Sequence, residues 1–371
     1  MIERVRMDEI ADVTKLAGFE FTKYMEYIPD GEIITVRALN LKNGSLVLDD
    51  VRRIERSVSD SLTRSKLYVN DIVLSYTGTI GETAQITENN RYHLAPNVAK
   101  IAPDISKINP QYLFLYIRSD EFKQQMLNHA HGSTQMTVPM KVIRELTVPI
   151  CERSTQDKIA SILVSIDRKI ENNKRINDNL QQQAQAIYAS MFITNADPAW
   201  TQGHLSDLIT VKYGKDHKKL ADGVYPVFGS GGIMRYVERP LYTGESVLIP
   251  RKGTLNNVMY VNEPFWSVDT MFYTEMKVPN VAKFVFHFVK AKDLASMNAG
   301  SAVPSMTTDI LNALELAIPP AERLAEFESV VAPMYQAMQA NSREAAKLAE
   351  LRDTLLPRLM SGEIDVSDIQ I

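Results

Sequence analysis

Two stretches of the chain carry the same heptad pattern, with an asparagine at the same place in each. The two asparagines, Asn173 and Asn341, lie 168 residues apart, and the surrounding apolar positions repeat at that offset. Apolar residues at a seven-residue period predict a helix that packs along one seam against another helix, and a polar residue in the seam fixes the register. The repeated positions are Ile159, Ile166, Asn173, Leu180 and Ile187, and then Phe327, Met334, Asn341, Leu348 and Leu355. We therefore expect an antiparallel helix pair with a pseudo-two-fold axis near the asparagines.

The ends of these two helices carry their own signals. The first helix is predicted from about Ser154 to Phe192, with Ser154 or Thr155 as its N-cap. Such a helix is roughly 58 Å long at the usual rise per residue. The second helix contains Pro333 and, near its end, Pro357. Proline removes a hydrogen-bond donor and crowds the preceding turn, so a kink is expected at the first and termination near the second.

The similarity between the two halves extends beyond the helices. Several short segments of the first half match segments of the second half, and the matches occur in the same order. Ordered matches of this kind indicate a duplicated unit of about half the chain. The matching pairs are DIVLSYTGTIGETAQI (71–86) with SVLIPRKGTLNNVMYV (246–261), Gly132-Ser133 with Gly300-Ser301, and RELTVPICER (144–153) with LELAIPPAER (314–323).

Between the matched points the pattern favours β-structure. Short β-rich segments alternate with Gly, Asn, Asp and Pro, as in a sheet with tight turns. A helix is expected in 110–129, so the fold class is α+β, with two mixed α/β domains and a pair of long antiparallel coiled-coil helices. The expected strands lie in 36–48, 72–76, 224–228, 246–249 and 258–261.

The bulk composition is that of an ordinary folded protein. The chain has 371 residues, of which 45% are hydrophobic, so it can bury two or more cores. Cys151 is the only cysteine, which excludes an internal disulfide, and the charged start MIERVRMDEI does not fit a signal peptide. The longest apolar stretch, at 285–289, is far too short to span a bilayer. A cytoplasmic protein without membrane contact is the expectation.

Net charge gives no support for nucleic-acid binding, but its distribution is uneven. The formal net charge is −4, whereas bases outnumber acids in 36–66 and in 211–219. Clustered bases of this kind are suited to phosphate contacts, and an ordinary solvated surface is the alternative.

Sequence motifs for catalysis and metal binding are absent or incomplete. DPAW (197–200) resembles the motif of amino-methyltransferases, but no glycine-rich loop after a strand accompanies it. GSGG (229–232) lacks the ending of a P-loop, which leaves a tight turn or a close approach to a nucleic-acid backbone. His129 and His131 have no ligand partners at metal-site spacing. We therefore expect no catalytic residue and no bound metal.

The end of the second helix is the most specific motif. LRDTLLPRLMSGEI (351–364) resembles the signature that ends the second helical region of specificity subunits of type I restriction-modification systems. IDRKIENNKRINDNLQQQAQAIYASMF (166–192) is similar to the central helical region of that family. PVFGSGGIMRYVERPLYTGESVLIPRKGT (226–254) and FWSVDT (265–270) are similar to its target-recognition core. The resemblance covers nearly the whole chain in the order domain, helix, domain, helix.

This resemblance implies a complete functional description. Each globular domain would read one half of a bipartite, asymmetric site in double-stranded DNA, while the helices set the spacer and dock two methyltransferase subunits. Restriction/translocase subunits would be further partners. The chain would bind no cofactor, since S-adenosylmethionine belongs to the methyltransferase subunits. The implied order is target recognition domain 1 (1–150), the central helical region (151–195), target recognition domain 2 (196–320) and the C-terminal helical region (321–371).

Base reading requires forked or amide side chains on loops that reach base edges. In the first domain the candidates are Arg37, Asn40, Tyr76, Thr77, Thr79, Ser133, Thr134 and Gln135; in the second they are Lys215, His217, Lys218, Ser230, Arg235, Arg251, Lys252, Asn256 and Asn257. For each, an ordinary surface or sheet-edge position is the alternative. Asn173 and Asn341 are expected to fix the helix register, and Phe265 and Trp266 to lie in the core.

Two other classes of protein remain open at this stage. One is an enzyme, namely a fused methyltransferase or nuclease that acts alone, which the missing cofactor loops disfavour. The other is a non-enzymatic adaptor whose paired helices tether proteins while its β-rich domains bind peptides. Association with a methyltransferase and with modified DNA would distinguish the favoured function from both.

Overall fold

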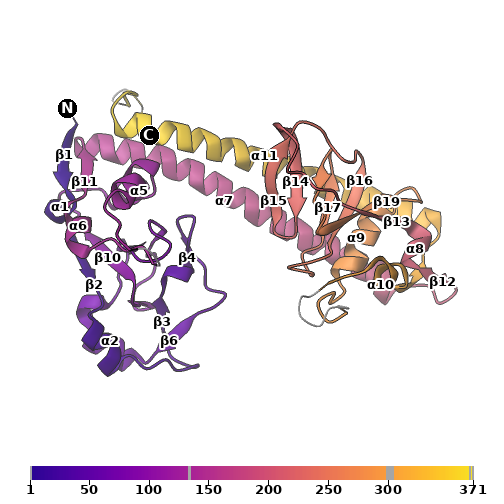
Figure 1. Cartoon of the computed structure of the whole chain (residues 1–371), viewed down its shortest axis with the longest axis horizontal. Coiled ribbons are helices and arrows are strands. Elements are labelled where there is room, and N and C mark those ends of the chain that lie inside the picture. Colours follow the sequence, from indigo (N-terminus) through magenta and orange to yellow (C-terminus); the bar gives the residue numbers. More distant parts are fainter. Residues whose placement is uncertain (1, 133–134, 298–304, 367–368, 370–371) are drawn as a thin grey trace. The chain divides into compact units, whose positions relative to one another are not determined.

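The computed structural model (Figure 1) describes residues 2–132, 135–297, 305–366 and 369. The chain divides into two compact units. The first contains Met1–Asn173 and Arg343–Ile371, and the second contains Lys174–Ser342. Each unit therefore holds one globular domain and one part of each long helix, and each is described on its own.

The first domain contains two sheets and a two-stranded ladder that joins its ends. The four-stranded sheet has the order β2-β10-β7-β8, the three-stranded sheet has the order β6-β3-β9, and β1 pairs with β11. In the three-stranded sheet β3 is antiparallel to β6 and parallel to β9. The bounds are β1 Glu3–Arg6, β2 Ala11–Lys15, β3 Ile33–Val36, β6 Arg52–Ile54, β7 Ile72–Ser75, β8 Thr83–Gln85, β9 Tyr92–Leu94, β10 Val98–Pro103 and β11 Thr147–Ile150.

The second domain repeats the strand order of both sheets and of the ladder. Its four-stranded sheet has the order β13-β19-β16-β17, its three-stranded sheet has the order β15-β14-β18 with β14 parallel to β18, and β12 pairs with β20. The predicted internal repeat is thus confirmed by strand order and direction. The bounds are β12 Thr201–His204, β13 Ile209–Tyr213, β14 Asp222–Gly229, β15 Gly232–Val237, β16 Glu245–Pro250, β17 Met259–Asn262, β18 Trp266–Ser267, β19 Met271–Met276 and β20 Glu315–Ile318.

The segment 36–48 is not the continuous strand expected from its composition. After β3 the chain forms the short helix η1 (Ala38–Asn40) and then a small hairpin of β4 (Leu41–Lys42) and β5 (Ser45–Leu46). The turn between these strands is Asn43-Gly44, and both residues have positive φ, 52° and 81°. An Asn-Gly dipeptide is the strongest short-range signal for such a hairpin, so the sequence contained the information.

Short helices cover the sheets of each domain. The expected helix in 110–129 is two helices, α4 and α5, because Ser119 caps the second by accepting a hydrogen bond from the amide of Phe122. The helices of the first domain are α1 Met7–Ile10, α2 Gly18–Tyr24, α3 Arg56–Ser61, η2 Thr63–Ser65, α4 Pro110–Ile117, α5 Asp120–Leu127 and α6 Met140–Glu145. Those of the second are α8 Leu205–Leu208, α9 Ala282–Lys290 and α10 Thr308–Asn312.

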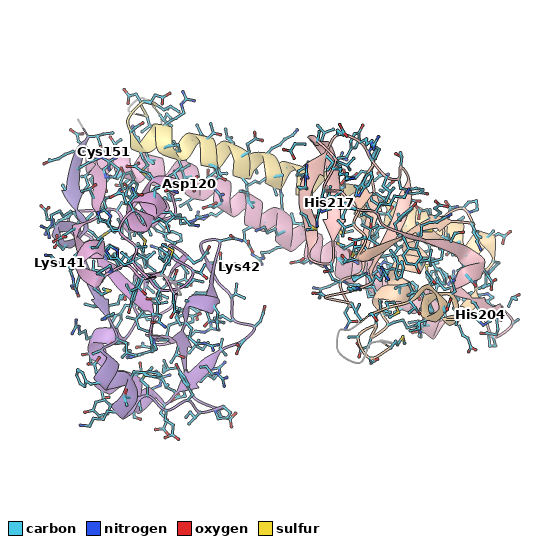
Figure 2. The ribbon with its side chains drawn as sticks, in the orientation of Figure 1. Lys42, Asp120, Lys141, Cys151, His204 and His217 are labelled. Atoms are coloured by element: carbon cyan, nitrogen blue, oxygen red, sulfur yellow. The ribbon has the colours of Figure 1, made fainter. Side chains whose placement is uncertain are left out.

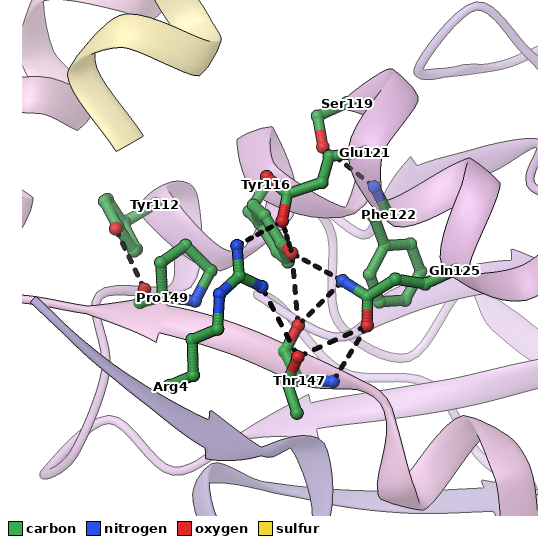
Figure 3. Close-up of polar contacts among 9 residues, drawn as sticks. All are labelled: Arg4, Tyr112, Tyr116, Ser119, Glu121, Phe122, Gln125, Thr147 and Pro149. Carbon is green, nitrogen blue, oxygen red and sulfur yellow. Dashed lines mark hydrogen bonds and ion pairs between the residues drawn. The ribbon is translucent and has the colours of Figure 1, made fainter. Parts of the chain in front are cut away.

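A polar network fastens α4 and α5 to the β1–β11 ladder (Figure 3). The hydroxyl of Tyr116 donates to the carbonyl of Thr147 at 3.1 Å and to Glu121 at 3.2 Å. The amide of Gln125 donates to the Tyr116 hydroxyl at 2.7 Å and to the same Thr147 carbonyl at 3.1 Å. Arg4 of β1 completes the network through an ion pair with Glu121. Burial raises the pKa of Tyr116 to about 12, so its hydroxyl stays protonated as this arrangement requires.

The two long helices are α7 (Arg153–Ala189), which continues as the π-helical turn η3 (Ser190–Thr194), and α11 (Ala321–Met360). Ser154 and Thr155 lie inside α7, which follows Glu152, so the predicted N-cap is wrong by two to three residues. The second helix continues through Pro333 and ends three residues after Pro357.

Contacts within each unit pair α7 and α11 in antiparallel directions (Figure 1). In the first unit Asp167 bonds Arg352, and the amide of Asn173 donates to Glu344 at 2.8 Å. In the second unit the amide of Asn341 donates to Asn177 at 2.9 Å. Residue numbers therefore increase along α7 in the direction in which they decrease along α11, as in an antiparallel pair. Both predicted seam asparagines face the partner helix, and Asn173 is buried.

The heptad positions lead into the cores of the domains. In the first unit Ile159 is buried with Tyr112 and Phe122 of the globular domain. In the second unit Phe327 is buried with Tyr188 and Phe284, among a cluster of aromatic rings. One side of the helix pair therefore forms part of the hydrophobic core of each domain, and the helices and domains are expected to fold together.

Candidate nucleic-acid interface

The turn after β7 brings several first-domain candidates together. Thr77 forms an isolated β-bridge with Thr137, whose hydroxyl donates to that of Thr77 at 3.2 Å. The amide of Gly78 donates to the carbonyl of Met136 at 2.9 Å. The turn and the segment before α6 therefore lie side by side, and Thr79 and Gln135 are exposed on them. Ser133 and Thr134 lie outside the described residues.

The turn after β16 has the same arrangement in the second domain. Lys252 forms an isolated β-bridge with Ser305, and the amide of Met306 donates to the carbonyl of Arg251 at 2.9 Å. The matching glycines, Gly78 and Gly253, have φ of 79° and 84°. Glycine adopts this backbone conformation most readily, so the repeat preserved a turn geometry as well as a motif.

In the second domain a further turn adjoins this one. The amide of Asn257 donates to the carbonyl of Ser230 at 2.8 Å. A Cβ atom at Gly253 would lie only 2.7 Å from the Ser230 hydroxyl. Ser230 belongs to GSGG, which forms the tight turn of the β14–β15 hairpin and is followed by a strand. Four predicted residues, Ser230, Arg251, Lys252 and Asn257, thus share one surface.

Arg251 and Asn256 are positioned by neighbouring groups. The guanidinium of Arg251 lies over the ring of Tyr213, 5.4 Å from its centroid, and leaves the side chain partly exposed. The amide of Asn256 donates to Asp293 at 3.0 Å and helps to lower the pKa of that carboxyl. The guanidinium also donates one long hydrogen bond, 3.4 Å, to the carbonyl of Asp269. Stacking on the ring uses none of the other donors, so Arg251 remains able to bind a base or a phosphate.

The lysine-rich loop after β13 is anchored through its backbone. The amide of Lys215 donates to the carbonyl of Ser267 at 2.8 Å, and the indole of Trp266 donates to the carbonyl of Lys215 at 2.8 Å. Trp266 is 7% exposed, which confirms its predicted place in the core. The amide of Lys218 donates to Asp216 and lowers the pKa of that carboxyl. The ammonium groups of Lys215 and Lys218 extend from an anchored, exposed loop.

His217 lies in the same loop (Figure 2), half-buried. Its Nδ1 atom is buried and meets no hydrogen-bond partner among the described residues. Because this nitrogen is shielded by the protein, a base contact would have to use the other side of the ring.

Three predicted base readers are hydrogen-bonded within their own domains, and a fourth is buried. Asn40 is fully buried, and its amide donates to the carbonyls of Val47 and Asp50 at 2.9 and 2.8 Å. Arg37 donates to the Asp50 carbonyl at 2.8 Å, and Arg235 donates to Asp222 at 2.6 Å. Tyr76 is 8% exposed. The three hydrogen-bonded side chains hold loops in place, and we leave the buried Asn40 and Tyr76 out of the proposed reading surface.

The β4–β5 hairpin is a part of the first-domain surface that composition alone did not predict. The amide of Asn43 donates to Glu82 at 3.1 Å, and Gly44 forms a bridge with Ala84 of β8. The hairpin therefore lies against β8, beside the turn that follows β7, and its Lys42 is exposed (Figure 2). The Asn43-Gly44 dipeptide was the sequence signal from which the exposed position of Lys42 on this hairpin could have been predicted.

Ion pairs reduce the positive charge predicted for 36–66. Arg56 pairs with Glu32 at 3.2 Å, and Lys66 pairs with Asp60 at 2.6 Å. Exposed pairs of this kind contribute little to stability, but they lower the local potential that attracts phosphates. Local charge is therefore a weaker argument for this domain than the run of basic residues indicated.

Neither a metal-binding cluster nor a membrane-spanning helix occurs in the part of the chain that the structure describes. There, no three His, Cys, Asp or Glu side chains are grouped so that they could hold a metal ion. Over the same residues, no helix combines the length and the apolar character that crossing a membrane requires.

The fold of the chain is that of a known structure. The S subunit of a type I restriction-modification system from M. genitalium superposes with a TM-score of 0.62, over 97% of this chain and 96% of that one, at 17% sequence identity. This likeness extends through both domains and both long helices.

The chain belongs to the family of type I restriction modification DNA specificity domains, which it matches over residues 2–182 and again over 199–326. It is 21% identical to the type I restriction enzyme MjaIX specificity subunit of Methanocaldococcus jannaschii, over 97% of this chain and 94% of the relative. It is also 21% identical to the HindI specificity subunit of Haemophilus influenzae, over 74% and 82%. The resemblance seen in the sequence is confirmed: the chain is a DNA sequence-recognition subunit without catalysis of its own.

Proposed function

We propose that each globular domain reads one half of a bipartite, asymmetric site in double-stranded DNA through the turn after β7 or β16. One observation carries this proposal. The two turns have the same backbone geometry and the same neighbouring segment, yet the partly exposed Arg251 and the exposed Lys252 of the second domain stand where the first has the buried Tyr76 and the partly exposed Thr77. A constant frame with different exposed side chains is what two readers of different sequences require.

The side chains favour different bases in the two halves. Arg251 offers a guanidinium, which suits guanine in the major groove, while the amide of Asn257 bonds the Ser230 carbonyl and supports the neighbouring turn. Thr79 and Gln135 offer a hydroxyl with a methyl group and an amide, which suit A·T pairs. We infer that the second half-site contains a guanine read by Arg251 and that the first half-site is richer in A·T.

Partner subunits complete the proposed assembly. Two methyltransferase subunits, which would bind S-adenosylmethionine, are proposed to dock on the helix pair, and restriction/translocase subunits would join them. The net charge of −4 supports a division of labour in which partners supply most phosphate contacts and this chain supplies base reading.

Methylation sequencing tests the division into half-sites. The chain is expressed with its methyltransferase, first unchanged and then with Arg251→Ala or Gln135→Ala. We expect the first variant to relax one half of the methylated motif and the second variant to relax the other half, by about tenfold at the affected base. Lys23→Ala, at an exposed site on α2 outside both turns and both long helices, is the control. Relaxation of both halves by one substitution would disprove the assignment of one half-site to each domain.

Matched insertions test whether the helices set the spacer. We propose that the seam, with Asn173 and Asn341, fixes the helix register, so both helices must be lengthened together. Three additional heptads in each add roughly 31 Å, close to the roughly 34 Å of one DNA turn. The spacer is expected to grow by about nine base pairs with both half-sites unchanged. An unchanged spacer in an active complex would refute this role.

A further inference from the structure

The β14–β15 hairpin of the second domain exposes apolar side chains at its tip. Ile233 is 50% exposed and Met234 is 61% exposed, directly after the turn Ser230-Gly231-Gly232. A Cβ atom at either glycine would meet nothing within 4 Å. The tip is therefore narrow, and large apolar groups at an exposed tip are unfavourable in water unless a ligand covers them.

The tip is built as a defined structure. Ile233 pairs with Phe228 across the hairpin, and Gly232 pairs with Gly229. A Cβ atom at Gly229 would lie only 2.5 Å from the sulfur of Met234. Met234 therefore packs directly against the backbone of Gly229. Because glycine has no side chain, position 229 leaves the space that Met234 occupies.

This tip is continuous with the proposed reading surface. Ser230 connects them, because its carbonyl accepts from Asn257 and its hydroxyl lies against Gly253. Arg251 and Lys252 precede that glycine. Apolar side chains next to cationic groups are complementary to stacked bases next to phosphates. DNA is therefore favoured over an apolar protein surface as the ligand of this tip.

We propose that Ile233 and Met234 form a wedge that inserts at a base step of, or next to, the half-site read by the second domain. Isoleucine and methionine are among the side chains that enter base steps, where they unstack the bases and kink the duplex. The wedge makes the deformability of that step part of the specificity, so a flexible pyrimidine–purine step is expected there. The inference rests on the proposed function of the second domain.

Fluorescence of 2-aminopurine tests the wedge directly. The complex of the chain with its methyltransferase is mixed with duplexes that carry 2-aminopurine at successive positions across the half-site. Unstacking raises the fluorescence, and we expect the increase at one step only. Ile233→Ala/Met234→Ala should abolish this increase and weaken specific binding by about tenfold or more. Gly229→Ala, which displaces Met234 without removing it, should reduce the signal in part.

Val224→Ala is the matched control, because Val224 is 77% exposed on the same hairpin but at the end far from the turn. It should leave both measurements unchanged. The wedge is refuted if the double variant keeps the fluorescence increase, or if it loses only the retention of methyltransferase in a pull-down. Arg251→Ala serves as a separate reference. If it relaxes the half-site while the double variant has no effect, the wedge fails and the proposed function stands.

Discussion

The two domains share a strand topology, but they are joined to the long helices by opposite charge networks. In the first unit the carboxylate of Asp167 on α7 lies between Arg118 of the domain and Arg352 of α11, at 2.7 Å from each. In the second unit the ammonium of Lys283 lies between Glu245, at 2.7 Å, and Glu328 of α11, at 2.6 Å. One network centres on an acid of the helix, the other on a base of the domain.

Equivalent helix positions have taken on different partners. Asp167 and Tyr335 are 168 residues apart and so occupy the same place in the repeat. Tyr335 contacts the second domain through a hydrogen bond to His287 at 3.0 Å and through its ring, which lies 5.7 Å from the Lys283 ammonium. The topology was thus retained after duplication, while the polar contacts between domain and helix diverged.

The two charge networks also differ in how far the contacts of α11 depend on a side chain of the globular domain. Asp167 and Arg352 lie on the two helices, so this pair joins α7 to α11 whether or not Arg118 takes part. Glu328 depends on Lys283, a residue of the domain whose side chain is 4% exposed. Burial opposes ionisation of Glu245, but hydrogen bonds from Lys283 and Tyr260 outweigh it and lower its pKa. The second domain is therefore expected to be the more tightly coupled to its helices.

Removal of the buried ammonium should have the largest effect. Lys283→Met removes an ammonium whose side chain is only 4% exposed and leaves Glu245 and Glu328 without the cation between them. We expect the free energy of unfolding of the second unit to fall by about 3–5 kcal/mol, as for other buried pairs that lose one partner. Chemical denaturation with hydrogen exchange, which separates the two units, provides the measurement.

The matched change in the first unit should cost less. Asp167→Asn removes a carboxylate that is 27% exposed, far more than Lys283, and the asparagine keeps an oxygen that can accept a hydrogen bond from an arginine. A loss of about 1–2 kcal/mol is expected. Lys174→Met, at an exposed helix position, controls for the loss of a lysine. Equal losses for Lys283→Met and Asp167→Asn would contradict the difference in coupling.

In acid the two domains should behave alike. Each contains one buried histidine, His93 or His287, and burial lowers the pKa of both to about 4. Repulsion from Lys100 and Lys66 contributes further for His93. Because the folded pKa is depressed, the stabilisation is complete above the unfolded value near 6.5 and is lost as pH falls toward 4. Each histidine should cost about 2 kcal/mol at pH 5.

Unfolding free energies measured between pH 8 and pH 5 test this expectation. His93→Gln should flatten the pH dependence of the first unit only, and His287→Gln that of the second only. The exposed His204 (Figure 2) provides a control substitution outside either core. A pH dependence that survives both substitutions would assign acid sensitivity to other groups.

The repeat was the most predictable part of this molecule. Heptad positions such as Ile159 and Phe327 recur at a fixed offset, and burial of an apolar seam depends on that spacing alone. The matched turns at Gly78 and Gly253 were visible because positive φ restricts the residue type. Features fixed by local geometry or by periodicity could therefore be predicted from the sequence.

The side chains that face DNA were much harder to predict. Asn40 and Arg37 have the chemistry of base readers, but their hydrogen bonds go to the loop at 47–50. The partner of a polar side chain depends on contacts distant in the sequence, such as those of Lys283 with Glu245 and Glu328. No pattern of spacing specifies these contacts, so residue type alone did not separate readers from loop supports.

The smallest expected difference concerns the two matched turn glycines. Gly78→Ala and Gly253→Ala each force an L-residue into positive φ, at about 1–2 kcal/mol of domain stability. A Cβ at Gly78 makes only an ordinary contact with Gln135 at 3.6 Å, whereas a Cβ at Gly253 lies 2.7 Å from the Ser230 hydroxyl. Gly253→Ala should therefore also displace Ser230 and lower methylation severalfold more than Gly78→Ala does. Asparagine tolerates positive φ, so Gly78→Asn should recover most of the loss and Gly253→Asn only part of it. Adding Ser230→Gly to Gly253→Ala should relieve the clash, and equal behaviour of the two turns in all these variants would show that the second reading surface does not depend on the contact with Ser230.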